Sequence, residues 1–205
     1  MTALSNHLNV ILDGLDRRRS VPSRQLGAPG PDDETLLRML RSAVRVPDHG
    51  RRVPFRFLTV KGDNRHALGA LLAERSRERD PSALDAVVEK DRRRFDAAPV
   101  IVTVIAKVGP DEKIPVQERV LSAGCVCFAL LQAAQGLGYG AQWLTGWAAY
   151  DPVIAGHLGV GADETIVGFI HIGTASVETP ERERPDPAAL LSDWSPAQSP
   201  AGADV

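Results

Sequence analysis

The sequence predicts an α+β domain in which helices cover both faces of one sheet. Short runs rich in β-branched and aromatic residues alternate with longer segments of helical periodicity. One run, at residues 100–105, is apolar almost throughout, which indicates a strand covered on both faces. At 205 residues the chain is long enough to bury one core of this kind.

Composition places the chain among ordinary folded proteins. Hydrophobic residues make up 43% and charged residues 24%, and a formal net charge of -2 gives no global reason to bind nucleic acid or an anionic membrane. The N-terminus lacks the pattern of a secretory signal, and the apolar segments at residues 100–106 and 120–134 are shorter than a membrane-spanning helix. We therefore expect a cytoplasmic protein without a transmembrane helix, in which Cys125 and Cys127 are reduced, buried thiols.

Six segments carry apolar residues at helical spacing and predict helices. Asp32 or Asp33 can cap the second of them, which Pro47 ends, and Asp151 followed by Pro152 can cap the sixth. The fourth closes with the charged stretch 89–94, which we interpret as a solvated face. The fifth is apolar nearly all round and predicts a buried helix that forms the spine of the domain. The segments lie at residues 8–15, 33–44, 68–72, 84–88, 120–137 and 152–158.

Between these helices, three or four strands are expected. The candidate runs lie at residues 55–60, 100–105, 138–145 and 165–172. From Thr174 onward repeated prolines exclude a long helix and favour an extended arm. We therefore divide the chain into a single domain at 1–178 and a Pro-rich arm at 179–205.

Three clusters could support chemistry. Arg18, Arg19 and Ser20 follow the first helix, and guanidinium groups with a hydroxyl suit a phosphate, although a basic helix end is also a common solvated feature. Arg45 and His49 flank a turn in which the histidine could equally be an ordinary surface residue. The glycines at 136–140 would let a planar group approach the backbone closely. Because they precede a strand instead of opening a helix, they are not a phosphate-binding fingerprint.

The order and spacing of these clusters resemble the nitroreductase family, and the resemblance covers nearly the whole chain. It rests on five motifs in sequence order: Arg18-Arg19-Ser20, the Arg-x-Pro-Asp-His turn at 45–49, Ser122-Ala123-Gly124, the Gly-rich turn that leads to Trp143, Thr145 and Gly146, and the strand with its closing glycine at 166–173.

The resemblance implies a nitroreductase-like homodimer, with a central, mostly antiparallel sheet and FMN at the subunit interface. NAD(P)H would reduce the flavin, which would then pass electrons to nitro compounds, quinones or similar acceptors by a ping-pong mechanism. No side-chain nucleophile or metal site is expected, because the cofactor carries the chemistry. No nucleic-acid or membrane partner is expected.

The family's binding residues map onto the following positions of this sequence. Arg18, Arg19 and Ser20 would hold the phosphate and ribityl chain, and Arg45 and His49 would come from the partner subunit. Three residues would line the flavin ring: Trp143, Leu144 and Thr145. By analogy, the nicotinamide would lie near Ala133, Ala134, Gln135, Gly136, Leu137 and Gly138.

Three departures from the family pattern concern the pocket. The position of the basic residue that serves the flavin N1 and O2 edge holds Pro22, and the next base is Arg24. The usual Gln-Pro-Trp is replaced by the sequence Val-Pro-Phe at 53–55. The C-terminal base that contacts the phosphate has two candidates, Arg182 and Arg184. Glu118 also matches a family position, with either an ion pair or a catalytic role.

Other functions are compatible with the same residues. A related flavin enzyme could carry out dehalogenation, ene reduction or an oxidase-like reaction. A flavin-binding protein could store or sense the cofactor without turnover, and a structural protein could have lost it. The sequence does not distinguish NADH from NADPH or identify the electron acceptor.

Overall fold

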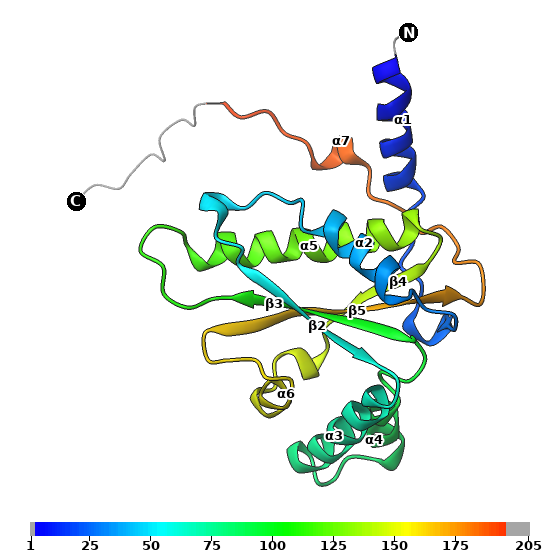
Figure 1. Cartoon of the computed structure of the whole chain (residues 1–205), viewed down its shortest axis with the longest axis vertical. Helices are drawn as coiled ribbons and strands as arrows, with labels where there is room; N and C mark the ends of the chain where they lie inside the picture. Colours follow the sequence, from blue (N-terminus) through cyan, green and yellow to red (C-terminus); the bar gives the residue numbers. More distant parts are fainter. Residues whose placement is uncertain (1–2, 196–205) are drawn as a thin grey trace.

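A computed structural model describes residues 3–195, with side chains described from Val10 onward, and shows a sheet between two helical layers (Figure 1). Every strand pair is antiparallel, and the order is β1-β5-β3-β2, with β4 also paired to β5. The strands are β1 (Leu26–Gly27), β2 (Phe55–Lys61), β3 (Val100–Lys107), β4 (Gly140–Leu144) and β5 (Glu164–Ala175). The α+β class and the mostly antiparallel sheet are confirmed, although β1 was not foreseen.

The central strand β3 divides the core into two layers. Val102 and Val104 point to one face, where they pack in the cluster beneath α5 (Val116–Gly136). Ile101 and Ile105 point to the other face and belong to a separate cluster. All four are fully buried, as the unbroken apolar run predicted for a strand covered on both faces.

The helices form a layer on each face of the sheet, with α2 and α5 on one side and α3, α4 and α6 on the other (Figure 1). Asp32 caps α2 by accepting a bond from the Thr35 N–H at 2.8 Å, and Asp151 caps α6 by accepting from the Val153 and Ile154 N–H groups. The remaining helices are α1 (Ala3–Asp16), α2 (Asp33–Ala43), α3 (Asn64–Arg79), α4 (Asp85–Arg92), α6 (Pro152–His157) and α7 (Pro187–Leu190). Short 3-10 turns occur at η1 (Ser23–Gln25), η2 (His49–Arg51) and η3 (Trp147–Ala149).

Helix α5 is buried on one side only, so the prediction of a helix buried all round was wrong. Leu121 is 61% exposed and Phe128 is 42% exposed, and Cys125 between them is exposed as well. The reason is geometric, because the sheet and α2 cover one side of the helix, and within residues 10–195 the other side remains exposed at Leu121 and Phe128. By length and composition alone α5 could cross a membrane. Its packing against β3, β4, β5 and α2 accounts for that composition without one.

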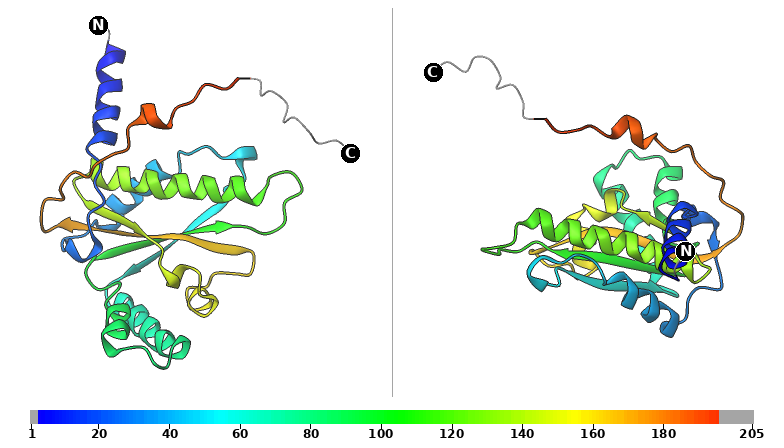
Figure 2. Two further views of the ribbon diagram at one scale, coloured as in Figure 1. Left: turned by 180° about the vertical axis from the view of Figure 1, so that it is seen from behind. Right: turned by 90° about the horizontal axis from the view of Figure 1, so that it is seen from above.

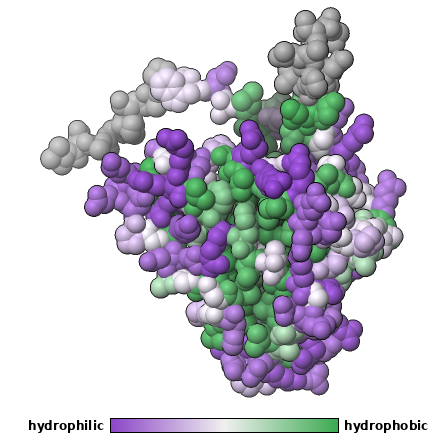
Figure 3. Space-filling model, in the orientation of Figure 1, coloured by the Kyte–Doolittle hydropathy of each residue, from purple (hydrophilic) through white to green (hydrophobic). Residues whose placement is uncertain are grey.

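Both ends of the described chain extend away from the sandwich. Figures 1 and 2 show α1 projecting from one end, and the segment after β5 leaving the sheet and carrying the single turn α7. Each presents apolar side chains to solvent, including Ile11 and Leu12 on α1 and Leu190 and Trp194 beyond β5. Figure 3 shows further apolar surface down the middle of the face seen in Figure 1, flanked by polar side chains. Large exposed apolar patches are common at sites of protein association or ligand binding.

Candidate flavin site

Two segments far apart in the sequence form a small, strongly basic pocket. Arg18 and Ser20 lie beside each other, with the Arg18 Nη1 donating to the Ser20 Oγ at 3.1 Å. Both C-terminal candidate bases, Arg182 and Arg184, line the same pocket. The complete lining is Arg18, Arg19, Ser20, Thr179, Pro180, Arg182 and Arg184. Guanidinium and hydroxyl donors that converge in this way suit a phosphate group.

One carboxylate partly balances this positive charge. Glu181 forms ion pairs with Arg19 and with Arg184, the latter at 2.9 Å. The backbone N–H of Arg182, followed by the guanidinium groups of Arg184 and Arg19, lowers the pKa of Glu181. The four guanidinium groups of the pocket therefore outnumber this neighbouring carboxylate, and the pocket keeps a net positive charge.

The basic segment is fixed to the end of α5 and to β4. Gln135 accepts a bond from the Arg19 N–H at 3.2 Å and donates to the Gly14 carbonyl at 3.0 Å. One residue beyond Ser20, the Val21 N–H donates to the Ala141 carbonyl at 3.1 Å. The first residues of the chain after α1 thus run along the outer edge of β4.

The outer edge of β4 turns backbone groups away from β5. Since the Ala141 carbonyl points away from β5, alternation along the strand turns the backbone of Trp143 outward too. The Trp143 indole points elsewhere, because its Nε1 donates to the Val167 carbonyl at 3.1 Å and its ring lies against Gly168. The backbone of Trp143 therefore faces the outer edge of β4, and its side chain packs against Val167 and Gly168 of β5. Leu144 and Thr145, which continue the chain, are half-buried.

The turn after Thr145 is held by Arg94, a residue that the sequence analysis missed. Gly146 has φ +63° and ψ -175°, a conformation that essentially only glycine adopts, and a Cβ there would lie 2.5 Å from the Arg94 Nη1. Asp91 accepts a bond from the Arg94 Nη2 at 2.7 Å and bonds from the Trp147 Nε1 at 3.2 Å. Asp91 is buried, so the interpretation of stretch 89–94 as a solvated face was wrong for Asp91 and Arg94.

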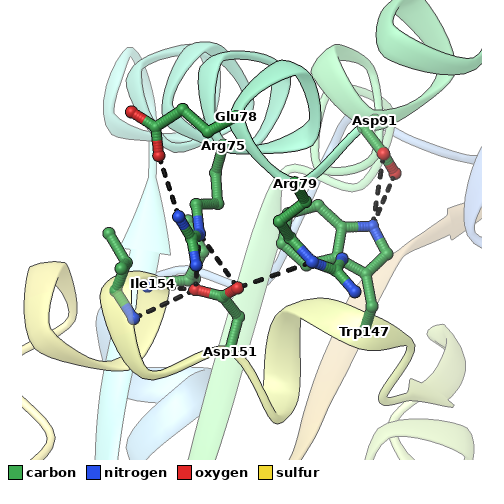
Figure 4. Close-up of polar contacts among 8 residues, drawn as sticks. Arg75, Glu78, Arg79, Asp91, Trp147, Asp151 and Ile154 are labelled. Carbon is green, nitrogen blue, oxygen red and sulfur yellow. Dashed lines mark hydrogen bonds and ion pairs between the residues drawn. The ribbon is translucent and has the colours of Figure 1, made fainter. Parts of the chain in front are cut away.

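Helix α3 holds the same turn from outside, as Figure 4 shows. The Arg79 guanidinium lies 4.4 Å from the centroid of the Trp147 ring, and Arg75 binds the Asp151 carboxylate at 3.0 Å. The helix that carries these arginines belongs to the layer opposite α5. The turn at Gly146 therefore lies between β4 and the packed pair of helices α3 and α4.

The second cluster lies at the opposite end of α5. The His49 Nδ1 is 2.6 Å from the Glu118 Oε2, and Arg45 is exposed nearby in sequence. Glu118 and Gln135 mark the two ends of the helix and lie about 25 Å apart along its axis, because an α-helix rises about 1.5 Å per residue. Within one chain, His49 and the basic pocket therefore lie too far apart for both to contact the same end of one bound cofactor.

The segment at 133–138 divides between two surroundings. Ala134 is fully buried in the core, and Gln135 holds the basic segment. Ala133, Gly136 and Leu137 line a separate pocket between α2 and α5. The proximity of these residues to a nicotinamide remains a prediction.

Comparison with known proteins identifies the family. The model of the Nitroreductase family matches residues 15–174. The chain is 32% identical over 182 residues to "Putative NAD(P)H nitroreductase YdjA" of Escherichia coli (strain K12), covering 88% of this chain and 97% of the relative.

Two solved structures have the same fold. A nitroreductase-like family protein from Bacillus cereus has a TM-score of 0.75 at 22% identity, covering 90% of this chain and 95% of that one. A putative nitroreductase in complex with FMN, from Desulfovibrio desulfuricans, has a TM-score of 0.68 at 22% identity, covering 91% of this chain and 98% of that one. The chain belongs to the nitroreductase family, an oxidoreductase family, and the resemblance inferred from its motifs is confirmed.

Proposed function

We propose that this protein is an FMN-dependent NAD(P)H oxidoreductase that works as a cytoplasmic homodimer. The observation that carries the proposal is the basic pocket of Arg18, Ser20, Arg182 and Arg184, which continues directly into the outer edge of β4. The relatives' names support it, since they refer to NAD(P)H nitroreductases and to a complex with FMN.

The residues fit FMN at both of its ends. The pocket provides charge-assisted donors for a phosphate, and the Trp143 backbone on the β4 edge provides the donor and acceptor that the polar edge of a flavin ring requires. The chain segment that joins these two places is short and fixed, because Val21 pairs with Ala141. Leu144 and Thr145 would complete the wall beside the ring.

When bound, FMN would supply the redox chemistry, accepting hydride from NAD(P)H and passing electrons to a nitro compound, quinone or similar acceptor in a ping-pong cycle. The protein's part is binding, orientation and charge. Arg94 would place a guanidinium, ion-paired with Asp91 at 2.7 Å, beside the turn at Gly146. Guanidinium N–H groups directed at the ring would favour the reduced, anionic cofactor.

The shared site follows from the two ends of α5. A second copy packed antiparallel on the exposed side of α5 would bring its His49 end beside the Gln135 and Arg18 end of the first. The stripe of Leu121, Cys125 and Phe128, spaced at one face of the helix, provides the apolar surface for that contact. A two-fold arrangement generates two equivalent sites, each with Arg45 and His49 from the partner. The projecting α1 and the described part of the proposed arm, residues 179–195, would add surface to it, and residues 196–205 of that arm lie outside the described residues.

The cofactor and its reduction provide the first test. Purified protein should release FMN and no FAD on denaturation, because the sequence lacks a dinucleotide fingerprint. Anaerobic addition of NADPH or NADH should bleach the flavin rapidly, and a nitro or quinone acceptor should restore its colour. Bound flavin that no nicotinamide reduces would indicate the storage or sensing alternative. Protein that binds no FMN on reconstitution would contradict the proposal.

Substitution in the basic pocket provides the second test. Arg18→Ala should weaken FMN binding about 10- to 150-fold, since a hydrogen bond to a charged group contributes about 1.5 to 3 kcal/mol. Arg17→Ala is the matched control, because Arg17 is an exposed neighbour outside the pocket lining. Equal FMN dissociation constants for the two variants in a titration of apo-protein would show that the pocket does not bind the phosphate.

A further inference from the structure

Helix α5 holds the loop that carries His49 at two points. The Glu118 Oε2 lies 2.6 Å from the His49 Nδ1, and the Ser122 hydroxyl donates to the Pro47 carbonyl. Glu118 and Ser122 are four residues apart and therefore lie on the same face of the helix. Two bonds one helical turn apart fix both the position of the loop and the orientation of the imidazole.

The loop adopts a costly backbone conformation. Gly50, Arg51 and Val53 have φ values of +66°, +53° and +47°, a region that β-branched residues such as valine rarely enter. Asp48 supports the turn by accepting bonds from the Arg52 N–H at 3.0 Å and the Val53 N–H at 2.8 Å. Strain of this kind persists where surrounding bonds determine the conformation, and it gathers at functional sites.

Stability alone does not account for the contact between His49 and Glu118. The two side chains are 62% and 46% exposed, and pairs with this exposure contribute little to folding. The contact does determine which ring nitrogen carries hydrogen. A carboxylate can only accept, so Nδ1 must be the donor, which leaves the Nε2 of a neutral imidazole as an acceptor.

We propose that Glu118 is a positioning residue that presents the His49 Nε2 as a hydrogen-bond acceptor to the FMN bound in the partner subunit's pocket. The inference rests on the proposed shared flavin site. Glu118 would act only by orienting His49 and would not itself contact the cofactor. The group recognised would be a hydrogen-bond donor of FMN, which a ribityl hydroxyl or the ring N–H supplies.

The first test measures the tautomer of His49. Nitrogen-15 spectra of the full-length FMN-free protein at pH 8, assigned with a His49→Ala sample, should show a protonated Nδ1 and an unprotonated Nε2. In Glu118→Gln the side-chain amide can donate as well as accept, so the Nε2-protonated form should appear. Glu112→Gln, which removes an exposed carboxylate before α5, should leave the spectrum unchanged. An identical tautomer in wild type and Glu118→Gln would overturn the proposal.

The second test is a double-mutant cycle on FMN affinity. Glu118→Gln should weaken FMN binding about 3- to 10-fold, as expected for one hydrogen bond, and should have no further effect in a His49→Ala background. An equal loss in both backgrounds would show that Glu118 acts independently of His49. Wild-type affinity in His49→Ala, together with weak binding in Arg18→Ala, would overturn this inference and leave the phosphate pocket intact. Wild-type affinity in Arg18→Ala would instead contradict the proposed site itself.

Discussion

Replacing His171 by leucine measures how much a buried, neutral imidazole makes the free energy of unfolding depend on pH. His171 lies on β5, is 1% exposed and stacks on Phe95 with ring centroids 5.5 Å apart. Among the described residues, neither of its ring nitrogens has a hydrogen-bond partner. Burial, with a smaller contribution from the positive charge of Arg94, lowers the pKa of His171 from 6.5 to about 4.

The sign of the pH effect follows from this lowered pKa. Between pH 6.5 and 4 the unfolded chain binds a proton at His171 that the folded chain does not, so the free energy of unfolding falls as the pH drops through that window. Because a tenfold change in proton affinity corresponds to about 1.4 kcal/mol, the complete loss is about 3 kcal/mol. Between pH 8 and pH 5.5 the loss from this residue should be about 1.4 kcal/mol.

Denaturant unfolding of wild type and His171→Leu at pH 8 and pH 5.5, at one protein concentration, provides the assay. Wild type should lose about 1.4 kcal/mol more than the variant between the two pH values, because leucine cannot titrate. His157→Gln, which alters an exposed histidine at the end of α6, should follow wild type. The same pH dependence in wild type and His171→Leu would refute the account of a neutral, buried imidazole.

One substitution examines the turn beside the flavin ring, and the reactivity of a cysteine examines the dimer. Gly146→Ala should weaken FMN binding and lower stability by about 1 to 3 kcal/mol, since its backbone conformation suits only glycine and a Cβ would meet Arg94, whereas Gly156→Ala, with open space around it in α6, should be tolerated. Unfolding curves and FMN titrations that are the same for Gly146→Ala and wild type would contradict this account of the turn. In the proposed dimer Cys125, exposed in the single chain, lies between the two α5 helices, so both it and Cys127, whose pKa burial raises to about 12, should react with a maleimide only after unfolding. Rapid labelling of Cys125 in the native protein would argue against antiparallel packing of α5.

Local sequence signals predicted the elements whose causes are local. The carboxylates of Asp32 and Asp151 cap helices because each precedes a helical segment whose first N–H groups need acceptors. Residues 100–105 were predicted to form a strand covered on both faces because the side chains on both faces are apolar, and these residues are buried. Strand β1 could not be found in this way, since two residues, Leu26 and Gly27, carry no periodicity and pair with β5 through tertiary contact alone.

The covering of α5 illustrates a different limit. Its sequence is apolar on both sides, which predicts two covered faces, but the sequence does not say whether the same chain provides both covers. The single chain buries one side and leaves Leu121 and Phe128 exposed. The same ambiguity applies to Cys125, which was expected to be buried and is exposed. An apolar pattern therefore predicts that a face is covered, but it does not predict whether the same chain or a partner covers it.

The site could be predicted where its residues form a short motif and not where it depends on long-range contact. Arg18 and Ser20 stand together in the sequence, but their approach to Arg182 and Arg184 joins segments that only the fold brings together. Within the charged stretch 89–94 nothing local distinguishes Asp91, which is buried by Trp147 and Arg94, from its exposed neighbours. The high density of charged residues predicted solvent exposure for the whole stretch, whereas the bonds of Asp91 to Trp147 and Arg94 leave Asp91 buried.

Complementation between two variants with weakened FMN binding tests the shared flavin site most directly. Arg18→Ala and His49→Ala chains, each impaired alone, would be co-expressed with different tags, and the heterodimer carrying both tags isolated. One of its two sites would then carry both substitutions and the other neither. The account predicts that the heterodimer binds about one FMN per dimer tightly and regains NAD(P)H-dependent reduction of its flavin. Isolated heterodimer without such recovery, or a flavin-loaded monomer in sedimentation, would contradict it.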